Sequence, residues 1–333
     1  MRQEATSTAT RLETHARSAV LAAPGRIQLK TAGLPEPGPG QVRVRLEGCG
    51  VCASNLAPWA GAPWFEYPFP DGAPGHEGWG LVDRIGSGVT GIEEGDRVAT
   101  IANGAFATHL VLDAVDVVPI PTVLRDIPLP GEPLGCVMNI LRRSAVEPGQ
   151  TVAIVGTGFL GLLLTQLAAR TGAKVIAISR RPSALALAER MGAARTIPMD
   201  DHTGIIEEVK ECTRGAMCDR VIEAVGKQWP LDLAGELTRE GGRLIVAGYH
   251  QDGPRQVNMQ LWNWRGIDVI NAHERDVEVV RRGVREAVQA MAEGRLDPSP
   301  LYTHWFLLER LGEALDAARD RPEGFIKALI TIA

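Results

Sequence analysis

The chain has 333 residues, of which 45% are hydrophobic and 23% charged, and its formal net charge is −5. This length allows two domains with a large core, whereas the mild negative charge gives no indication of a nucleic-acid or membrane-surface partner. No apolar run reaches the ~18 residues of a transmembrane helix, and five cysteines are too few for a disulfide scaffold, so we expect a cytoplasmic protein.

The N-terminal part is predicted to be rich in strands. Residues 1–16 are polar, and we expect them to be a poorly ordered tail. From residue 17 to about residue 125, Gly and Pro separate short alternating runs such as QVRVRLEG (41–48). Period-2 alternation between turn residues is typical of strands, so this region is predicted to form a β-rich domain.

From about residue 150, short apolar strands alternate with helices. Strands are expected at TVAIV (151–155), AKVIAIS (173–179), RTIPM (195–199), DRVIEAVG (219–226), RLIVAGY (243–249) and DVINAH (268–273). Helices are expected at FLGLLLTQLAARTGA (159–173), PSALALAERMGA (182–193), IIEEVKECT (205–213), PLDLAGELTRE (230–240) and 275–292. This alternation predicts a doubly wound parallel sheet with helices on both faces, and hence an α/β protein.

A glycine-rich turn follows the first of these strands. It matches the G-x-G-x-x-G fingerprint of dinucleotide-binding domains and consists of Gly156, Thr157, Gly158, Phe159, Leu160 and Gly161. The glycines permit a tight turn, close approach of the pyrophosphate and close helix–strand packing, and the helix N-terminus attracts the phosphates. Because strand, turn and helix all fall where the fingerprint needs them, we expect this turn to bind a nicotinamide dinucleotide.

The second strand of this domain ends without a carboxylate. An NAD site would place Asp or Glu there for the ribose hydroxyls, but the chain has Ser179, Arg180 and Arg181. Two guanidinium groups can receive a 2′-phosphate, which favours NADP(H). The alternative is that both arginines are solvated turn residues and that NAD(H) binds instead.

A second set of residues has the chemistry of a metal site. Cys52 is followed by His76-Glu77 within PGHEGWG, and Glu132 lies just before the dinucleotide-binding domain. Thiolate, imidazole and carboxylate are zinc ligands, and a catalytic zinc needs three of them and an open position. Cys49 forms a C-x-x-C pair with Cys52, but with no second pair in the chain it is interpreted as a buried thiol.

The assembled pattern resembles the medium-chain dehydrogenase/reductase family, in its zinc-dependent alcohol and polyol dehydrogenase branch (sorbitol/threonine dehydrogenase-like). The resemblance covers about residues 17–333, and the matching stretches are PGPGQVRVRLEGCGVCASN, PGHEGWG, GDRVA, GEPLGCVMNILRRSAVEPGQTVAIVGTGFLG and LDPSPLYTHWF…LGEALDAA. It implies a GroES-like catalytic domain (17–131), a Rossmann domain (132–273) and a C-terminal return to the catalytic domain (274–333).

The resemblance also assigns roles to residues. Cys52 and His76 match the family's zinc ligands, and either Glu77 or Glu132 is the third. Ser54 matches the hydroxyl that relays the substrate proton, so that Cys52, Ser54, His76 and Glu77 make up the expected catalytic set. A homodimer or homotetramer joined through edge strands of the Rossmann domains is also implied.

Three departures from the family pattern stand out. The four-cysteine structural zinc lobe that many members carry after GDRVA is not seen in the sequence, so the catalytic zinc is expected to be the only one. Asn55 replaces the aspartate that supports the zinc-bound histidine, which predicts that His76 is a weaker donor to the metal. Ala57 replaces a relay histidine, so the proton is expected to leave through Ser54 and water.

Together these features predict a zinc-dependent oxidoreductase that moves a hydride between NADP(H) and a secondary alcohol, polyol or cyclitol, or the matching ketone. One alternative is a zinc-independent, NADPH-dependent reductase of enones or quinones on the same fold. Another is a non-catalytic, NADPH-binding regulatory protein.

Overall fold

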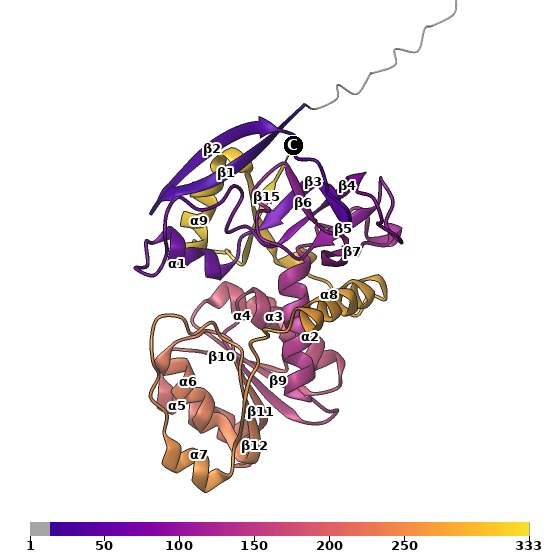
Figure 1. Ribbon diagram of the computed structural model, residues 1–333. Helices are drawn as coiled ribbons and strands as arrows, with labels where there is room; N and C mark the ends of the chain where they lie inside the picture. The colour runs from indigo at the N-terminus through magenta and orange to yellow at the C-terminus, as the bar shows by residue number, and fades with distance from the viewer. Residues whose placement is uncertain (1–13, 333) are drawn as a thin grey trace, which may run out of the picture.

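The computed structural model describes residues 14–332, which fold into two lobes (Figure 1). One lobe contains both ends of the described chain and is built around a seven-stranded sheet in the order β14-β15-β3-β4-β5-β7, with β6 paired to β3. Its strands are β3 (Gln41–Gly50), β4 (Gly78–Ile85), β5 (Arg97–Thr100), β6 (His109–Asp113), β7 (Val117–Pro119), β14 (Tyr302–Leu307) and β15 (Lys327–Thr331). This is the predicted GroES-like domain, completed by strands from the C-terminal return.

Smaller elements flank this sheet. They are the hairpin β1 (His15–Ala23) and β2 (Arg26–Gly33), and the helices α1 (Leu56–Trp59) and α9 (Leu311–Asp320). Residues 15 and 16, assigned to the tail from the sequence, belong instead to β1, where they pair with Gly33 and Ala32. The rest of the predicted tail, except for Thr14, lies outside the described residues.

The second lobe is a six-stranded parallel sheet in the order β10-β9-β8-β11-β12-β13. Its strands are β8 (Thr151–Val155), β9 (Lys174–Ser179), β10 (Arg195–Pro198), β11 (Cys218–Glu223), β12 (Thr238–Val246) and β13 (Asp268–Asn271). Its helices are α3 (Phe159–Arg170), α4 (Pro182–Arg190), α5 (His202–Cys212), α6 (Gln228–Leu237) and α7 (Met259–Arg265). The predicted Rossmann fold is therefore confirmed.

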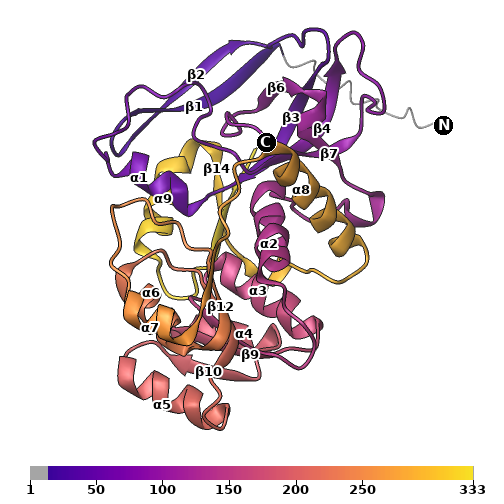
Figure 2. The same ribbon diagram turned by 60° about the horizontal axis from the view of Figure 1, so that its bottom comes forward.

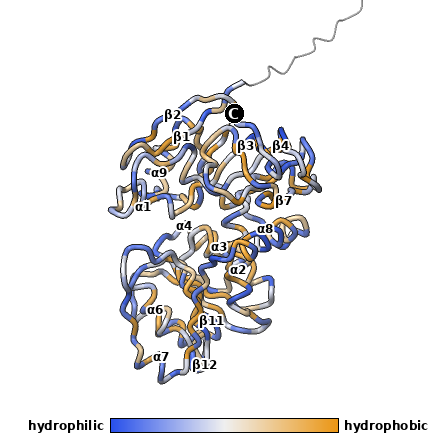
Figure 3. Tube along the Cα trace, viewed as in Figure 1, coloured by the Kyte–Doolittle hydropathy of each residue, from blue (hydrophilic) through white to orange (hydrophobic). Residues whose placement is uncertain are grey.

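Both faces of this sheet are covered (Figure 2). In β8, Val152 and Ile154 pack in the core cluster that includes α3 and α4, whereas Ala153 and Val155 pack in the cluster that includes α5 and α6. Consecutive strand residues point to opposite faces, which is why these strands are apolar throughout. Figure 3 shows the hydrophobic residues concentrated along the strands of this sheet and along α2 and α3.

Two long helices connect the lobes: α2 (Gly131–Ser144) and α8 (Val277–Ala292). They cross closely at Gly135 and Gly283, where glycine is needed: a Cβ at Gly283 would lie 2.7 Å from the carbonyl oxygen of Gly135. This packing fixes the N-terminus of α2, and with it Glu132, at the junction of the lobes. None of the helices within residues 14–332 is both long enough and apolar enough to cross a membrane.

Two helices differ from the sequence prediction. The helix expected over 230–240 is α6, which ends at Leu237 because Thr238 opens β12 and pairs with Cys218. No helix was predicted between the strands expected at 243–249 and 268–273, but this segment contains α7. Its start is capped by the Asn258 side chain, which accepts from Leu261 N at 3.0 Å, and Gly266 ends it in the left-handed region (φ 57°).

Candidate active site at the domain junction

Three potential metal ligands meet where β3 ends beside β4. The ligand atoms of Cys52, His76 and Glu77 all lie within 4.8 Å of one another. They meet because β3 and β4 pair antiparallel, with Cys49 opposite Gly78, so the residues after β3 lie beside those before β4. Among the described residues, this is the only group of three or more His, Cys, Asp and Glu side chains with such spacing. A thiol, an imidazole and a carboxylate form a donor set suited to zinc.

Gly50 makes room for this group. A Cβ at Gly50 would lie 1.8 Å from Glu77 Oε2, and Gly50 N donates to the carbonyl oxygen of Glu77 at 3.0 Å. Cys49, by contrast, lies fully buried in the core of the β domain, and burial raises its pKa far above the usual thiol range. Its Sγ donates to the carbonyl oxygen of Gly50 rather than facing the ligand group.

Asn55 organises the ligand group through the backbone. Its Oδ1 accepts from Cys52 N at 2.9 Å, and its Nδ2 donates to the carbonyl oxygen of Pro74 at 3.0 Å. The same carbonyl lies 2.8 Å from His76 Nδ1, which can donate to it and leave Nε2 as the free ligand nitrogen. Asn55 and His76 therefore share the Pro74 carbonyl oxygen as a hydrogen-bond partner.

The site favours positive charge. Burial opposes the charged imidazolium, but the hydrogen bond and charge of Cys52, helped by Glu132 and Glu77, raise the pKa of His76 to about 10. Burial raises the pKa of Glu132, although His76 lowers it, and Glu132 Oε1 accepts from Cys136 Sγ at 3.1 Å. Glu132 thus affects the pKa of His76, although it is not one of the three closely spaced ligand residues.

Lys327 is a site residue that the sequence analysis missed. Its Nζ lies 2.7 Å from Oε1 and 2.5 Å from Oε2 of Glu77, and both side chains are buried. The same Nζ lies 4.9 Å from the centre of the Phe159 ring at the start of α3. One cation thus contacts both the ligand group and the dinucleotide-binding turn. A lysine within the otherwise apolar run FIKALI (325–330) was the available signal.

Ser54 and Trp59 follow Cys52 closely in the chain. Ser54 lies next to Asn55 in the single turn of 3-10 helix that follows Cys52, and its hydroxyl has no hydrogen-bond partner within residues 14–332. Trp59 is buried, and its Nε1 donates to Asp316 Oδ1 at 2.9 Å. We therefore assign it to the packed core and not to a substrate site.

The glycine-rich turn has the geometry of a dinucleotide site. Gly156 has a φ of 103°, and a Cβ at Gly161 would lie 1.9 Å from the carbonyl oxygen of Gly156. A Cβ at Gly158 would meet open space, on the side where a pyrophosphate can approach. Thr157 is buried, and its Oγ1 has no hydrogen-bond partner. A buried, unpartnered hydroxyl beside an open helix N-terminus fits a phosphate ligand.

The predicted 2′-phosphate residues lie at the end of β9. Ser179 is buried, and its Oγ lies 3.5 Å from Arg181 N. Arg181 donates to the carbonyl oxygens of Phe325 and, at 3.5 Å, of Thr157. Arg180 is exposed. Within the described chain neither arginine forms an ion pair, so no carboxylate occupies this position.

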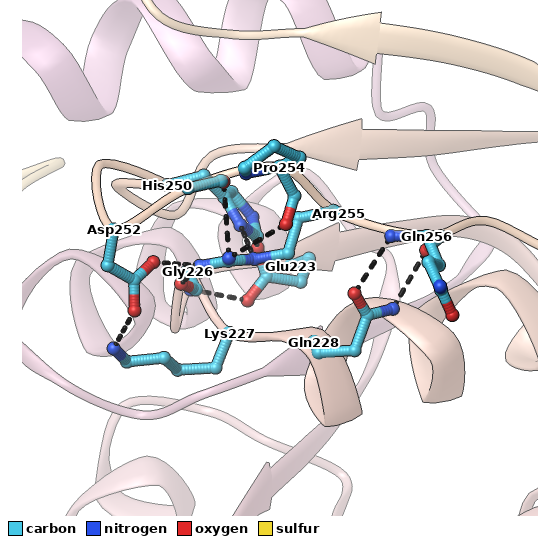
Figure 4. A network of polar contacts seen from close by, with 10 residues as sticks. Glu223, Gly226, Lys227, Gln228, His250, Asp252, Pro254, Arg255 and Gln256 are labelled. Atoms are coloured by element: carbon cyan, nitrogen blue, oxygen red, sulfur yellow. Dashed lines mark hydrogen bonds and ion pairs between the residues drawn. The ribbon is translucent and has the colours of Figure 1, made fainter.

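A network of polar contacts ties the loop after β12 to the end of β11 (Figure 4). Glu223, at the end of β11, accepts from Val225 N, Gly226 N and His250 Nε2, and His250 Nδ1 accepts from Arg255 at 3.0 Å. His250 is therefore a structural residue of this loop.

Tyr249, in the same loop, has a pKa that depends on the ligand group. Burial and then the charge of Cys52 raise its pKa, and its ring lies 6.4 Å from that of His273. Tyr249 was not identified from the sequence, because nothing in its local pattern distinguishes it from a strand-end tyrosine.

Comparison with known proteins agrees with this architecture. Residues 38–122 match the alcohol dehydrogenase GroES-like domain, and residues 160–293 match the zinc-binding dehydrogenase family. An alcohol dehydrogenase of Rhizobium meliloti is 30% identical over 79% of this chain and 84% of its own length. A sorbitol dehydrogenase of Gallus gallus is 27% identical over 90% of this chain and 92% of its own length.

Solved structures share the whole fold. A putative zinc-binding dehydrogenase from Sinorhizobium meliloti bound to NADP superposes with a TM-score of 0.83 at 24% identity, covering 96% of this chain and 100% of its own. The two lobes, the ligand group at their junction and these relatives lead to one assignment. The chain belongs to the zinc-binding alcohol dehydrogenases of the medium-chain family and is a zinc-dependent, NAD(P)-linked oxidoreductase.

Proposed function

We propose that this oxidoreductase transfers a hydride between NADP(H) and a secondary alcohol, polyol or cyclitol, or the corresponding ketone. The observation that carries the proposal is the group Cys52, His76 and Glu77, with Glu132 nearby, at the junction with the dinucleotide-binding domain. A site with two carboxylates, rather than several thiolates, resembles the polyol branch named in the sequence analysis. The sorbitol dehydrogenase similarity supports the same substrate class.

Each group has a defined part in this chemistry. Zinc supplies Lewis-acid polarisation of the carbinol oxygen, and the nicotinamide supplies the hydride acceptor. Cys52, His76 and Glu77 would hold the metal, and Lys327 fixes the Glu77 carboxylate. The Ser54 hydroxyl takes the substrate proton and passes it to water, because Ala57 leaves no histidine relay.

The preference for NADP(H) is supported by Arg180 and Arg181. Neither has a carboxylate partner among the described residues, and the position that an NAD site gives to Asp or Glu is Ser179. A charge-assisted hydrogen bond to a 2′-phosphate is typically strong enough to favour NADP(H) by about tenfold or more.

Initial rates with NADP⁺ and NAD⁺ across secondary alcohols, polyols and cyclitols test the proposal. We expect oxidation of at least one polyhydroxylated carbinol, with a higher kcat/KM for NADP⁺. Reduction of enones or quinones by metal-free enzyme would instead support the zinc-independent reductase. Cofactor binding without turnover of any carbonyl or carbinol would support the regulatory protein.

A cytoplasmic homo-oligomer joined through β13 completes the proposal. β13 is the last strand of its sheet, so one edge lacks a partner strand within residues 14–332. Nearby apolar side chains are solvent-exposed, with 41% of Val269 and 84% of Trp264 accessible. An exposed apolar edge strand is suited to pairing with a second copy of the chain.

A further inference from the structure

Three arginines belong to segments of the two lobes that meet at the domain junction. Arg180 and Arg181 follow β9 in the dinucleotide-binding domain, whereas Arg321 ends α9 in the catalytic domain. Arg181 links the two segments, because it donates to the carbonyl oxygen of Phe325, four residues after Arg321, and also to that of Thr157 at 3.5 Å. The end of β9 therefore lies against the segment that follows α9.

Desolvation and then charge repulsion within this group lower the pKa of two of its members, Arg181 and Arg321. Partial desolvation, then Arg321 and Arg180, lower the pKa of Arg181, and partial desolvation, then Arg180, lower the pKa of Arg321. Within residues 14–332 none of the three forms an ion pair with a carboxylate. By contrast Arg319, two residues before Arg321, pairs with Asp316 and Asp320. The junction thus holds positive charge that no carboxylate within residues 14–332 neutralises through an ion pair.

The location identifies the kind of anion. In a Rossmann domain the end of the second strand faces the adenosine ribose, and Thr157 belongs to the turn that receives the pyrophosphate. A phosphate on the ribose 2′-oxygen would stand among these guanidinium groups, each of which can donate two hydrogen bonds to it.

We propose that Arg321 is the third guanidinium of the 2′-phosphate site, so that the catalytic domain itself takes part in recognising NADP(H). This inference rests on the proposed preference for NADP(H) and extends it to a residue outside the Rossmann domain. The 2′-phosphate then bridges the two lobes, and NAD(H), which lacks it, leaves the end of α9 without this contact. The cofactor-selecting site is therefore shared between two domains.

The backbone at Arg321 makes a clean test possible. Its φ is 48°, in the left-handed region, and Asn tolerates this conformation better than other non-glycine residues. Arg321→Asn therefore removes the guanidinium while keeping the end of α9. Arg319→Gln is the matched control, since it removes one charge from the same helix end at a side chain that already has acidic partners.

Titration calorimetry with 2′,5′-ADP, 5′-AMP and inorganic phosphate isolates the 2′-phosphate without needing turnover. We expect the wild type to bind 2′,5′-ADP more tightly than 5′-AMP. Arg321→Asn should weaken 2′,5′-ADP by about tenfold, as expected for loss of a charge-assisted hydrogen bond, and leave 5′-AMP unchanged. Arg319→Gln should change neither, and an unchanged melting temperature of Arg321→Asn should show that the fold is kept.

Three results would overturn the inference. If the wild type discriminates but Arg321→Asn binds 2′,5′-ADP normally, Arg321 lies outside the site and the preference for NADP(H) stands. If the wild type does not discriminate, the preference for NADP(H) fails and the shared site fails with it. If inorganic phosphate binds as tightly as 2′,5′-ADP and loses the same affinity in Arg321→Asn, the cluster binds a free anion rather than the cofactor.

Discussion

At the residue scale, the ion pair between Lys327 and Glu77 connects the ligand group to the rest of the molecule. A buried carboxylate beside a metal needs a compensating charge when the metal is absent, and Lys327 provides it from the last strand. The same lysine fixes the orientation of the Glu77 carboxylate through both of its oxygens. Stability of the metal-free chain and geometry of the site therefore depend on one contact.

Lys327→Met should be strongly destabilising. It leaves the Glu77 carboxylate buried without a partner, which typically costs about 3–5 kcal/mol. Chemical denaturation of the metal-free protein measures this loss. The double variant Lys327→Met/Glu77→Gln should recover much of it, because it removes the unpaired charge as well. Equal instability of the single and double variants would show that Lys327 acts through packing and not through its charge.

At the element scale, the turn between β8 and α3 gives its glycines separate tasks. A Cβ at Gly161 meets the backbone of Gly156 at 1.9 Å, whereas a Cβ at Gly158 meets open space. One glycine therefore serves the fold and the other leaves room for the ligand. This separation makes the fingerprint more than a pattern match, since each position can be tested on its own.

Gly158→Ala should leave the stability of the cofactor-free protein almost unchanged but weaken binding of both NADP(H) and NAD(H), because the added methyl lies where the pyrophosphate approaches. Gly161→Ala should lower the melting temperature, because α3 must move away from β8. Fluorescence titration and thermal unfolding of both variants measure these effects. Normal cofactor affinity in Gly158→Ala would place the pyrophosphate elsewhere.

Several elements could be predicted because their signals are local. The alternation of apolar strands and helices from residue 150 identified the parallel sheet, and the fingerprint identified its ligand. Helix α7 was missed because an Asn cap and a short helix within a polar loop resemble turn residues. Lys327 and Arg321 were missed because their importance arises from contacts between segments far apart in the chain: Lys327 lies 250 residues from Glu77, and Phe325, near Arg321, lies 144 residues from Arg181.

At the scale of the whole molecule, the two lobes meet through side chains that also build the site. Arg181 ties the end of β9 to the segment after α9, and Lys327 touches both Glu77 and Phe159. Neither the catalytic domain nor the Rossmann domain carries a complete site alone. A ligand that contacts residues of both domains would therefore link them.

Assembly through β13 gives a further prediction at this scale. Val269→Lys places a charge on the exposed edge strand, where burial against a second chain would be unfavourable. Light scattering should show a dimer or tetramer for the wild type and a smaller species for the variant. An unchanged mass would assign the contact between copies to another surface.

The central claim is that Cys52, His76 and Glu77 hold a catalytic zinc. Elemental analysis of the wild type, Cys52→Ser and Cys49→Ser tests it most directly, since the two cysteines lie three residues apart and only Cys52 belongs to the ligand group. We expect about one zinc ion per chain in the wild type, as in other catalytic sites of this kind. Cys52→Ser should lose it and Cys49→Ser should keep it. A metal-free wild type after reconstitution with zinc, or full zinc content in Cys52→Ser, would contradict the account.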